Sequence, residues 1–320
     1  MVREVTTTAA PRFSVIVPTC NRTGPLAACL GALAEVEYPR DGFEVIVVDD
    51  ASAQPFPECE SNGLKVQWIR LNQNRGAAAA RNEGAARARG RYLAFLDDDC
   101  LPAKGWLNEL YQALEAVPGS AVGGRVVNGR SGNVYAAVNQ AMLDEVYRYY
   151  NAEPARARFF ATMNFAVPAA GFRESGGFDP SFRASEDREF CARWLERRLP
   201  LVYAPQAVVV HDSAPGWREF WNRHFRFGEG AYCFRRRHMT AGSRRVTLEP
   251  AGFYGRLVLS PLKSASGLRA VTTPGLACLS QFASGLGFWL GHRRYRQSVA
   301  ARPALEPATS GVRKRPNIVL

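Results

Sequence analysis

RYLAFLDDD, residues 91–99, is an apolar run that ends in three consecutive aspartates. Two earlier stretches have the same form: FSVIVP, residues 13–18, is closed by Pro18, and FEVIVVDD, residues 43–50, ends in two aspartates. Continuous apolar runs of this length are typical of strands that are buried on both faces of a parallel sheet. The runs therefore predict a central parallel sheet with carboxylates at its strand ends.

Helical patterns separate these runs. They cover residues 24–36, 76–89 and 105–117, and residues 65–71 alternate like a further strand. Strands that alternate with helices predict an α/β fold with a doubly wound, mostly parallel sheet. Ligands of such sheets bind beyond the carboxyl ends of the strands, where both acidic clusters fall. No GxGxxG motif follows the first strand, which argues against a dinucleotide-binding half.

The middle of the chain has a more irregular pattern. Within residues 120–210, the segments AVGGRVV (121–127) and LVYAPQAVVV (201–210) predict strands, and residues 186–198 predict a helix. An aromatic, arginine-rich helix is expected over residues 216–238.

The composition shifts toward Gly, Ser, Pro and Leu at about residue 241. We therefore expect a catalytic α/β domain over residues 12–240 and a helical C-terminal extension over 241–320, which ends in a flexible tail. The longest apolar stretch, residues 274–291, contains Gln281 and several Ser and Gly residues. It is a weak candidate for a membrane span and suits a buried or interfacial helix equally well.

Charge and cysteine content narrow the class of protein. Lys and Arg outnumber Asp and Glu by 41 to 29, which indicates either an anionic partner or a solvated basic surface. No RNP-type motif is present, so nucleic acid is not expected. The seven cysteines contain no CxxC pair, which favours free thiols in a reducing compartment.

The N-terminus lacks the apolar region of a secretory signal, and we expect a cytoplasmic protein that contacts the inner face of the cell membrane or stays in solution.

The aspartate triplet at the end of the 91–99 run suits a divalent cation. Three adjacent carboxylates repel one another, and their oxygens are the ligands that Mg²⁺ or Mn²⁺ prefers. In an extended chain Asp97 and Asp99 share a face while Asp98 points away. The alternative is a solvated acidic turn.

Two further features lie near the expected ligand site. Asp50, after the second strand, suits a hydrogen bond to a base or ribose, or else caps the next turn. Gly76 opens the Ala-rich helix, where backbone N–H groups favour phosphates. Arg81, one turn further on, either pairs with a diphosphate or is a solvated surface arginine.

The last candidates follow later in the chain. Glu186 and Asp187 begin the 186–198 helix, where their carboxylates either cap the helix or, in one case, act as a general base. His211 follows the third apolar strand-like run and is either a structural histidine or a ligand.

Taken together, these segments resemble the family 2 glycosyltransferases of GT-A fold. The resemblance runs from Phe13 to about Gly230 and rests on an ordered set of weak motifs. They are FSVIVPTCNR, VIVVDDAS, NRGAAAARNEG, YLAFLDDDCLP and GGFDPSFRASEDREF. One departure is Cys20, which stands where an aromatic residue is often found.

The resemblance implies roles for individual residues. Asp187, in the Glu186–Asp187 pair, matches the catalytic base, and Asp97-Asp98-Asp99 matches the DxD motif. Asp99 is the strongest metal ligand, and Asp97 or Asp98 lies near the ribose and metal. His211 matches a histidine that completes the metal shell in some members. The residues that match the nucleotide- and diphosphate-binding segments are Pro18, Thr19, Asn21, Arg22, Asp50, Gly76 and Arg81.

The activity implied is an inverting, metal-dependent transfer of a sugar from a nucleoside-diphosphate sugar to an acceptor hydroxyl, in polysaccharide, glycolipid or cell-envelope glycan synthesis. A nucleotidyltransferase of similar fold is the nearest alternative, although the loop after the first strand offers no lysine. A non-catalytic, membrane-associated protein is the second. The extension either contacts a membrane and brings the site to a lipid-linked acceptor or packs as a soluble helical pair on the catalytic domain.

Overall fold

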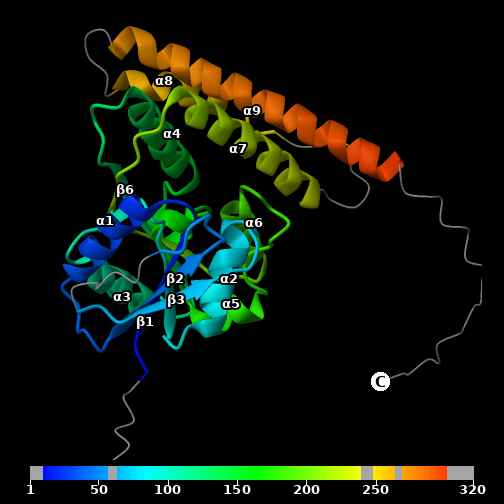
Figure 1. Cartoon of the computed structure of the whole chain (residues 1–320). Coiled ribbons are helices and arrows are strands. Elements are labelled where there is room, and N and C mark those ends of the chain that lie inside the picture. Colours follow the sequence, from blue (N-terminus) through cyan, green and yellow to red (C-terminus); the bar gives the residue numbers. More distant parts are fainter. Residues whose placement is uncertain (1–9, 57–62, 239–247, 264–268, 301–320) are drawn as a thin grey trace, which may run out of the picture.

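The computed structural model of the protein describes residues 10–56, 63–238, 248–263 and 269–300. The predicted boundary between residues 240 and 241 and the predicted tail lie outside the described residues. An α/β body forms one part of the molecule, and helices α7, α8 and α9 form a layer over it, with α4 between the two (Figure 1).

The body is built on one mixed sheet with the strand order β3-β2-β1-β4-β7-β6-β8-β5. The pairs β1–β2, β1–β4, β2–β3 and β6–β8 are parallel, and β4–β7, β6–β7 and β5–β8 are antiparallel. The predicted α/β class with a mostly parallel sheet is confirmed. The strands are β1 (Phe13–Thr19), β2 (Phe43–Asp49), β3 (Val66–Arg70), β4 (Tyr92–Phe95), β5 (Cys100–Pro102), β6 (Ala121–Asn128), β7 (Phe165–Pro168) and β8 (Leu201–His211).

Helices cover both faces of this sheet and continue into the extension, where the expected helical structure is confirmed. Short 3₁₀ turns lie at Pro154–Arg156, Thr162–Asn164 and Ser260–Lys263. The α-helices are α1 (Thr23–Ala34), α2 (Ala77–Arg87), α3 (Trp106–Ala116), α4 (Val134–Tyr150), α5 (Ala169–Glu174), α6 (Glu186–Glu196), α7 (Trp217–Arg237), α8 (Ala251–Leu259) and α9 (Arg269–Ala300).

Two predictions of local structure were wrong. The irregular stretch expected after residue 120 contains α4, whose apolar residues at helical spacing are interleaved with tyrosines and amides that obscured the period. The strand expected over 91–99 ends at Phe95, and residues 98–99 form a turn in which the Cys100 N–H donates to the Asp97 carbonyl at 3.0 Å.

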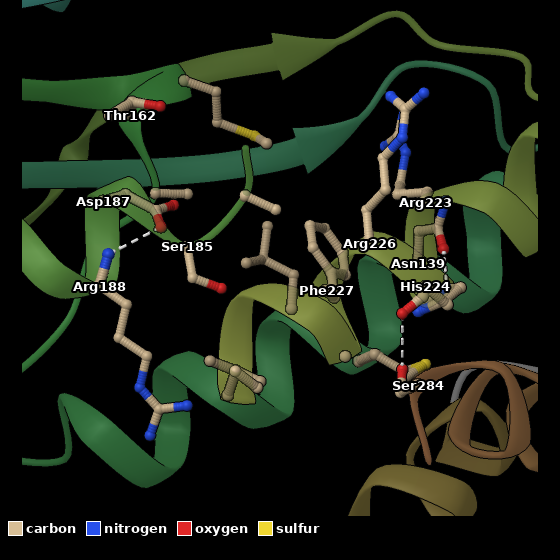
Figure 2. A pocket seen from close by; sticks show the side chains of 18 of the residues that line it. Asn139, Thr162, Ser185, Asp187, Arg188, Arg223, His224, Arg226, Phe227 and Ser284 are labelled. Atoms are coloured by element: carbon tan, nitrogen blue, oxygen red, sulfur yellow. Dashed lines mark hydrogen bonds between the residues drawn. The ribbon is translucent and has the colours of Figure 1, made fainter. Parts of the chain in front are cut away.

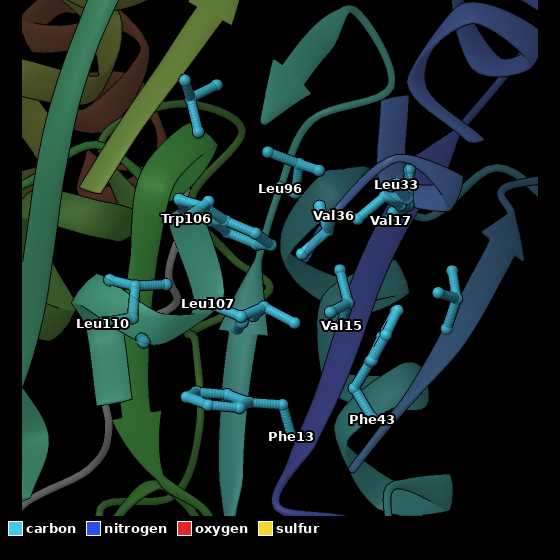
Figure 3. Packing of buried hydrophobic residues seen from close by; sticks show 14 of the residues in the cluster. Phe13, Val15, Val17, Leu33, Val36, Phe43, Leu96, Trp106, Leu107 and Leu110 are labelled. Carbon is cyan, nitrogen blue, oxygen red and sulfur yellow. The ribbon is translucent and has the colours of Figure 1, made fainter. Parts of the chain in front are cut away.

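The core explains why the first two strands are mostly apolar and buried at every position. Alternate residues of β1 point to opposite faces of the sheet: Val15 and Val17 pack in the cluster that includes α1 and α3, and Ile16 packs in the cluster that includes α2. Figure 3 shows Val15 and Val17 beside Leu33 of α1 and Leu107 of α3. Burial on both faces fixes the strand ends, and with them the acidic residues that follow.

Helix α7 packs closely against α9. A Cβ atom on Gly228 would lie 1.9 Å from the Ser284 carbonyl oxygen, and one on Gly287 would lie 2.0 Å from the Phe225 carbonyl oxygen. Only glycine permits this approach at either position. Neither α9 nor any other helix in the described part of the chain is long and apolar enough to cross a membrane.

Candidate active site

A large cavity, with a volume of about 1580 Å³, lies at the carboxyl ends of β1, β2 and β4 and continues between α4, α7, α8 and α9. The end next to the sheet holds most of the residues that the sequence singled out, so tertiary structure brings them together. Those that line the cavity are Pro18, Thr19, Arg22, Asp50, Arg81, Asp97, Asp98, Asp99, Glu186, Asp187 and His211.

Arg22 binds two of the three aspartates. Its terminal nitrogens donate to Asp98 Oδ1 and Asp99 Oδ2, both at 2.7 Å, and the Thr19 hydroxyl donates to Asp98 Oδ2 at 2.6 Å. The expectation that Asp98 points away from Asp99 was therefore wrong, because the turn at 98–99 breaks the alternation of an extended chain. Asp98 and Asp99 act together as one anionic surface.

The two carboxylates differ in their proton affinity. Burial raises the pKa of Asp98 to about 6, although the Thr19 hydrogen bond and the Arg22 charge oppose the rise. Burial also raises the pKa of Asp99, but hydrogen bonds and charges from His211 and Arg22 outweigh it and hold that pKa below the usual range. Asp99 is therefore the more firmly ionised of the two at neutral pH.

Asp97 is bound by the second arginine. Arg81 of α2 is 3% exposed and donates to Asp97 Oδ1 at 2.6 Å and to Glu186 Oε1 at 2.8 Å. One buried guanidinium thus ties the aspartate turn to the start of α6. Its buried Nε has no hydrogen-bond partner among the described residues.

Asp187 forms no ion pair with a cation among the described residues. It follows Glu186 in the first turn of α6, and the Arg188 backbone N–H donates to its Oδ1 at 2.7 Å. Burial, and then the negative charge of Glu186, raise the pKa of Asp187 to about 7. A carboxylate poised near neutral pH and facing a cavity is suited to accepting a proton.

His211 and Asp99 form the best pair for a metal ion. His211, at the end of β8, places Nε2 3.3 Å from Asp99 Oδ2. Adjacent ligands of an octahedral ion, each about 2.1 Å from it, lie about 3.0 Å apart, so this pair fits two neighbouring positions. In the described part of the chain no group of three or more His, Cys, Asp or Glu side chains could hold a metal ion. An ion here would take its other ligands from donor phosphates and water.

The remaining predicted residues shape the loops around this end. Asp50 accepts hydrogen bonds from the backbone N–H groups of Arg75 and Gly76, both at 2.8 Å. Gly76, with φ of 87°, precedes α2 in a conformation that favours glycine. Asn21 also has positive φ, and its side chain accepts from the Ala53 N–H at 2.8 Å. Asn21 and Gly76 do not line the cavity and position the loops that do.

No motif in the sequence predicted the far end of the cavity. Figure 2 shows Asp187 at one end, Arg223 and Arg226 of α7 at the other, and Phe227 between them. Asn139 Oδ1 of α4 accepts a 2.9 Å hydrogen bond from His224 Nε2, and burial lowers the pKa of His224 to about 4. The regular apolar spacing of Val138, Met142 and Val146 is the signal that would have revealed α4. Without α4, nothing in the sequence placed α7 opposite the acidic strand ends.

Known glycosyltransferases are similar to this chain along most of its length. A pre-mycofactocin glycosyltransferase of Mycobacterium tuberculosis is 29% identical over 233 residues, which cover 70% of this chain and 48% of the relative. The glycosyltransferase AglE of Haloferax volcanii is 26% identical over 236 residues, covering 70% of this chain and 74% of the relative. The chain therefore spans about half the length of the first relative and three quarters of the second.

Solved structures share the fold. A Pyrobaculum calidifontis mannosyltransferase in complex with GDP-Man and Mn²⁺ has a TM-score of 0.56 at 21% identity, over 91% of this chain and 80% of that one. Residues 1–349 of S. aureus TarS in complex with UDP-GlcNAc have a TM-score of 0.53 at 19% identity, over 90% of this chain and 92% of that one. At these identities the likeness establishes the GT-A type of fold.

The first half of the chain identifies the protein family. Residues 14–176 match the family described as Glycosyl transferase family 2. That stretch contains the first four strands, the aspartate turn and the loops around Asp50 and Gly76, and the predicted resemblance is confirmed. The chain belongs to glycosyl transferase family 2.

Proposed function

We propose that this glycosyltransferase transfers a sugar from a nucleoside-diphosphate sugar to an acceptor hydroxyl by single displacement with inversion, assisted by a divalent metal ion. The observation that carries the proposal is Asp187. It is the one carboxylate of the Glu186–Asp187 pair that Arg81 does not neutralise, and it faces the cavity that also holds the Asp99–His211 pair.

Asp187 is the base of the proposed reaction. The acceptor oxygen attacks the anomeric carbon, the bond from that carbon to the diphosphate oxygen breaks, and the hydroxyl proton passes to Asp187. One base suffices for a single displacement, because the diphosphate leaves as a stabilised anion. Its raised pKa makes Asp187 a stronger proton acceptor than an ordinary surface aspartate.

The departing diphosphate needs positive charge. Arg22 lies in the loop after β1 with its side chain 40% exposed, and it faces the aspartate turn. A Mn²⁺ or Mg²⁺ ion held by Asp99 and His211 would supply Lewis-acid stabilisation of the leaving group. Neighbours in complex with GDP-Man and Mn²⁺ and with UDP-GlcNAc support a nucleotide sugar as donor.

The acceptor would enter from the helical end of the cavity. That end extends from Asp187 past Phe227 to Arg223 and Arg226, which suits a glycan or lipid-linked acceptor that carries negative charge. Synthesis of a polysaccharide, glycolipid or cell-envelope glycan is the proposed setting. Membership in this family argues against the two alternatives, a nucleotidyltransferase and a non-catalytic membrane-associated protein.

A donor panel tests the proposal. Purified protein is incubated with GDP- and UDP-sugars, with Mn²⁺ or with EDTA, and release of nucleoside diphosphate is measured. We expect release from one donor class that requires the metal. Asp99→Asn should weaken metal-dependent binding of nucleoside diphosphate by about 10- to 100-fold, whereas the exposed Asp41→Asn should not change it. Pyrophosphate release from a nucleoside triphosphate, or metal-independent turnover, would contradict the proposal.

A further inference from the structure

The charge of the chain is distributed unevenly, and its balance changes at the start of α7. Residues 1–216 contain 23 Lys or Arg and 25 Asp or Glu, whereas residues 217–320 contain 18 and 4. Helix α9 contains no acidic residue. The positive surplus of the protein therefore belongs to the chain from α7 onward, and the α/β body is close to neutral.

Large exposed apolar side chains are concentrated in the same part of the chain, from α7 onward. In the described part of the chain, every large hydrophobic residue that is exposed falls after residue 216. Isolated exposed apolar residues are ordinary, but a concentration in one layer indicates a contact surface. These residues are Trp217, Phe227, Leu248, Leu259, Leu262, Leu279, Phe282 and Trp289.

Four of these residues, together with the half-buried Trp221, form a set that we call the aromatic stripe: Trp217, Trp221, Leu279, Phe282 and Trp289. The three α9 residues are exposed and recur at helical spacing, whereas Ser284 and Gly287 of α9 contact α7. The rings of Trp221 and Phe282 are 6.1 Å apart, which joins the two helices. Trp217 lies one turn before Trp221 on the same side of α7.

Each end of the stripe carries a tryptophan–arginine pair. The Arg218 guanidinium lies 5.7 Å from the Trp217 ring centroid, and that of Arg293 lies 4.5 Å from the Trp289 centroid. Neither arginine forms an ion pair with a carboxylate within the described ranges. Tryptophan beside arginine is suited to a lipid headgroup region, where the ring lies among acyl chains and the cation meets phosphate.

We infer that the layer of α7, α8 and α9 binds the surface of an anionic lipid bilayer through the aromatic stripe, as a peripheral contact. Charge complementarity favours a lipid surface, because anionic headgroups match a layer whose long helix α9 has no acid. The exposed residues Phe227, Leu248 and Leu259 also line the cavity, so its helical end opens within the same layer. An acceptor held in the bilayer would reach Asp187 from that side.

Vesicle co-sedimentation of the full chain tests this inference. We expect binding to vesicles of phosphatidylcholine and phosphatidylglycerol at 7:3, weaker binding at 0.5 M NaCl, and little binding to pure phosphatidylcholine. Arg218→Glu and Arg293→Glu should each lower the partition coefficient roughly fivefold. Phe282→Ser and Trp289→Ser should each lower it about tenfold or more, at low and high salt alike.

Arg173→Glu is the matched control, because Arg173 is an exposed arginine of α5, on the side of the body away from α9 (Figure 1). It should bind vesicles as the unaltered chain does. Unchanged melting temperature and unchanged donor turnover in solution show that each variant is folded. Equal binding by stripe variants and the unaltered chain would overturn the inference. So would a concentration-dependent dimer that the stripe variants abolish, since a second copy would then cover the stripe. No donor is present in the binding assay, so its outcome is separate from that of the proposed transfer.

Discussion

The two ends of the cavity are built from opposite charges. At the strand ends and the start of α6, six carboxylates line the cavity with Arg22 and Arg81, whereas α7 contributes three arginines and one acid, Glu219. An excess of carboxylates is suited to a cation and, through it, to a diphosphate. An excess of arginine is suited to an anionic acceptor. The difference indicates that donor and acceptor are recognised by separate walls, with Asp187 where the walls meet.

The strongest test of this division is Asp187→Asn. An amide of the same shape cannot accept the acceptor proton, so turnover should fall by roughly 10² to 10⁴ while nucleoside diphosphate affinity stays the same. Steady-state transfer rates and calorimetry of nucleotide binding measure the two. Asp41→Asn, an exposed aspartate outside the cavity, should turn over normally. A variant at position 187 with full turnover would remove Asp187 from its role.

Arg81 tests whether the donor wall depends on a buried ion pair. Arg81→Met leaves Asp97 and Glu186 without their shared cation, and we expect a loss of about 3 kcal/mol in the free energy of unfolding. Urea denaturation measures it. The matched control is Arg87→Met on the same helix, whose exposed pair with Glu83 should contribute less than about 0.5 kcal/mol. Equal effects of the two substitutions would show that Arg81 has no special structural role.

A substitution in the α7 wall of the cavity should change the KM for the acceptor and leave the reaction with the donor unchanged. Arg226→Ala removes a cation from the helical end of the cavity, so KM for an anionic acceptor should rise about tenfold. Hydrolysis of the donor in the absence of acceptor should stay unchanged, as it should in the exposed control Arg173→Ala. A loss of donor hydrolysis in Arg226→Ala would mean that the two walls are not separate.

The last expected effect is a gain in stability at high pH, which shows as a small shift in melting temperature. The folded pKa of Asp187 is raised to about 7, above an unfolded value of about 3.9. The folded state therefore binds more protons between these values, and stability falls as pH rises through that window. Asp187→Asn removes this loss, so the variant should melt a few degrees above the unaltered chain at pH 8 and at the same temperature below pH 4. A lower melting temperature at pH 8 would contradict the raised pKa.

The strands were predictable because their signal is local. β1 and β2 are buried at every position and mostly apolar, and a strand buried on both faces needs that composition. The turn at Asp98–Asp99 was not predictable from alternation, because Arg22 and Thr19, far away in the sequence, hold the carboxylates in place. The partners of Arg81 were equally hidden, since Glu186 lies 105 residues away.

The amino-acid sequence alone determined the fold class, the family and the carboxylates at the strand ends, because buried strands and ordered motifs are written in neighbouring residues. Only the tertiary structure decided which carboxylates are paired with an arginine. Arg22 binds Asp98 and Asp99, and Arg81 binds Asp97 and Glu186, whereas Asp187 has no ion pair in the part of the chain that the structure describes. It also placed α4 and α7 opposite the acidic wall. Electrostatic pairing acts through space, so the folded contacts, and not the order of residues, select the reactive group.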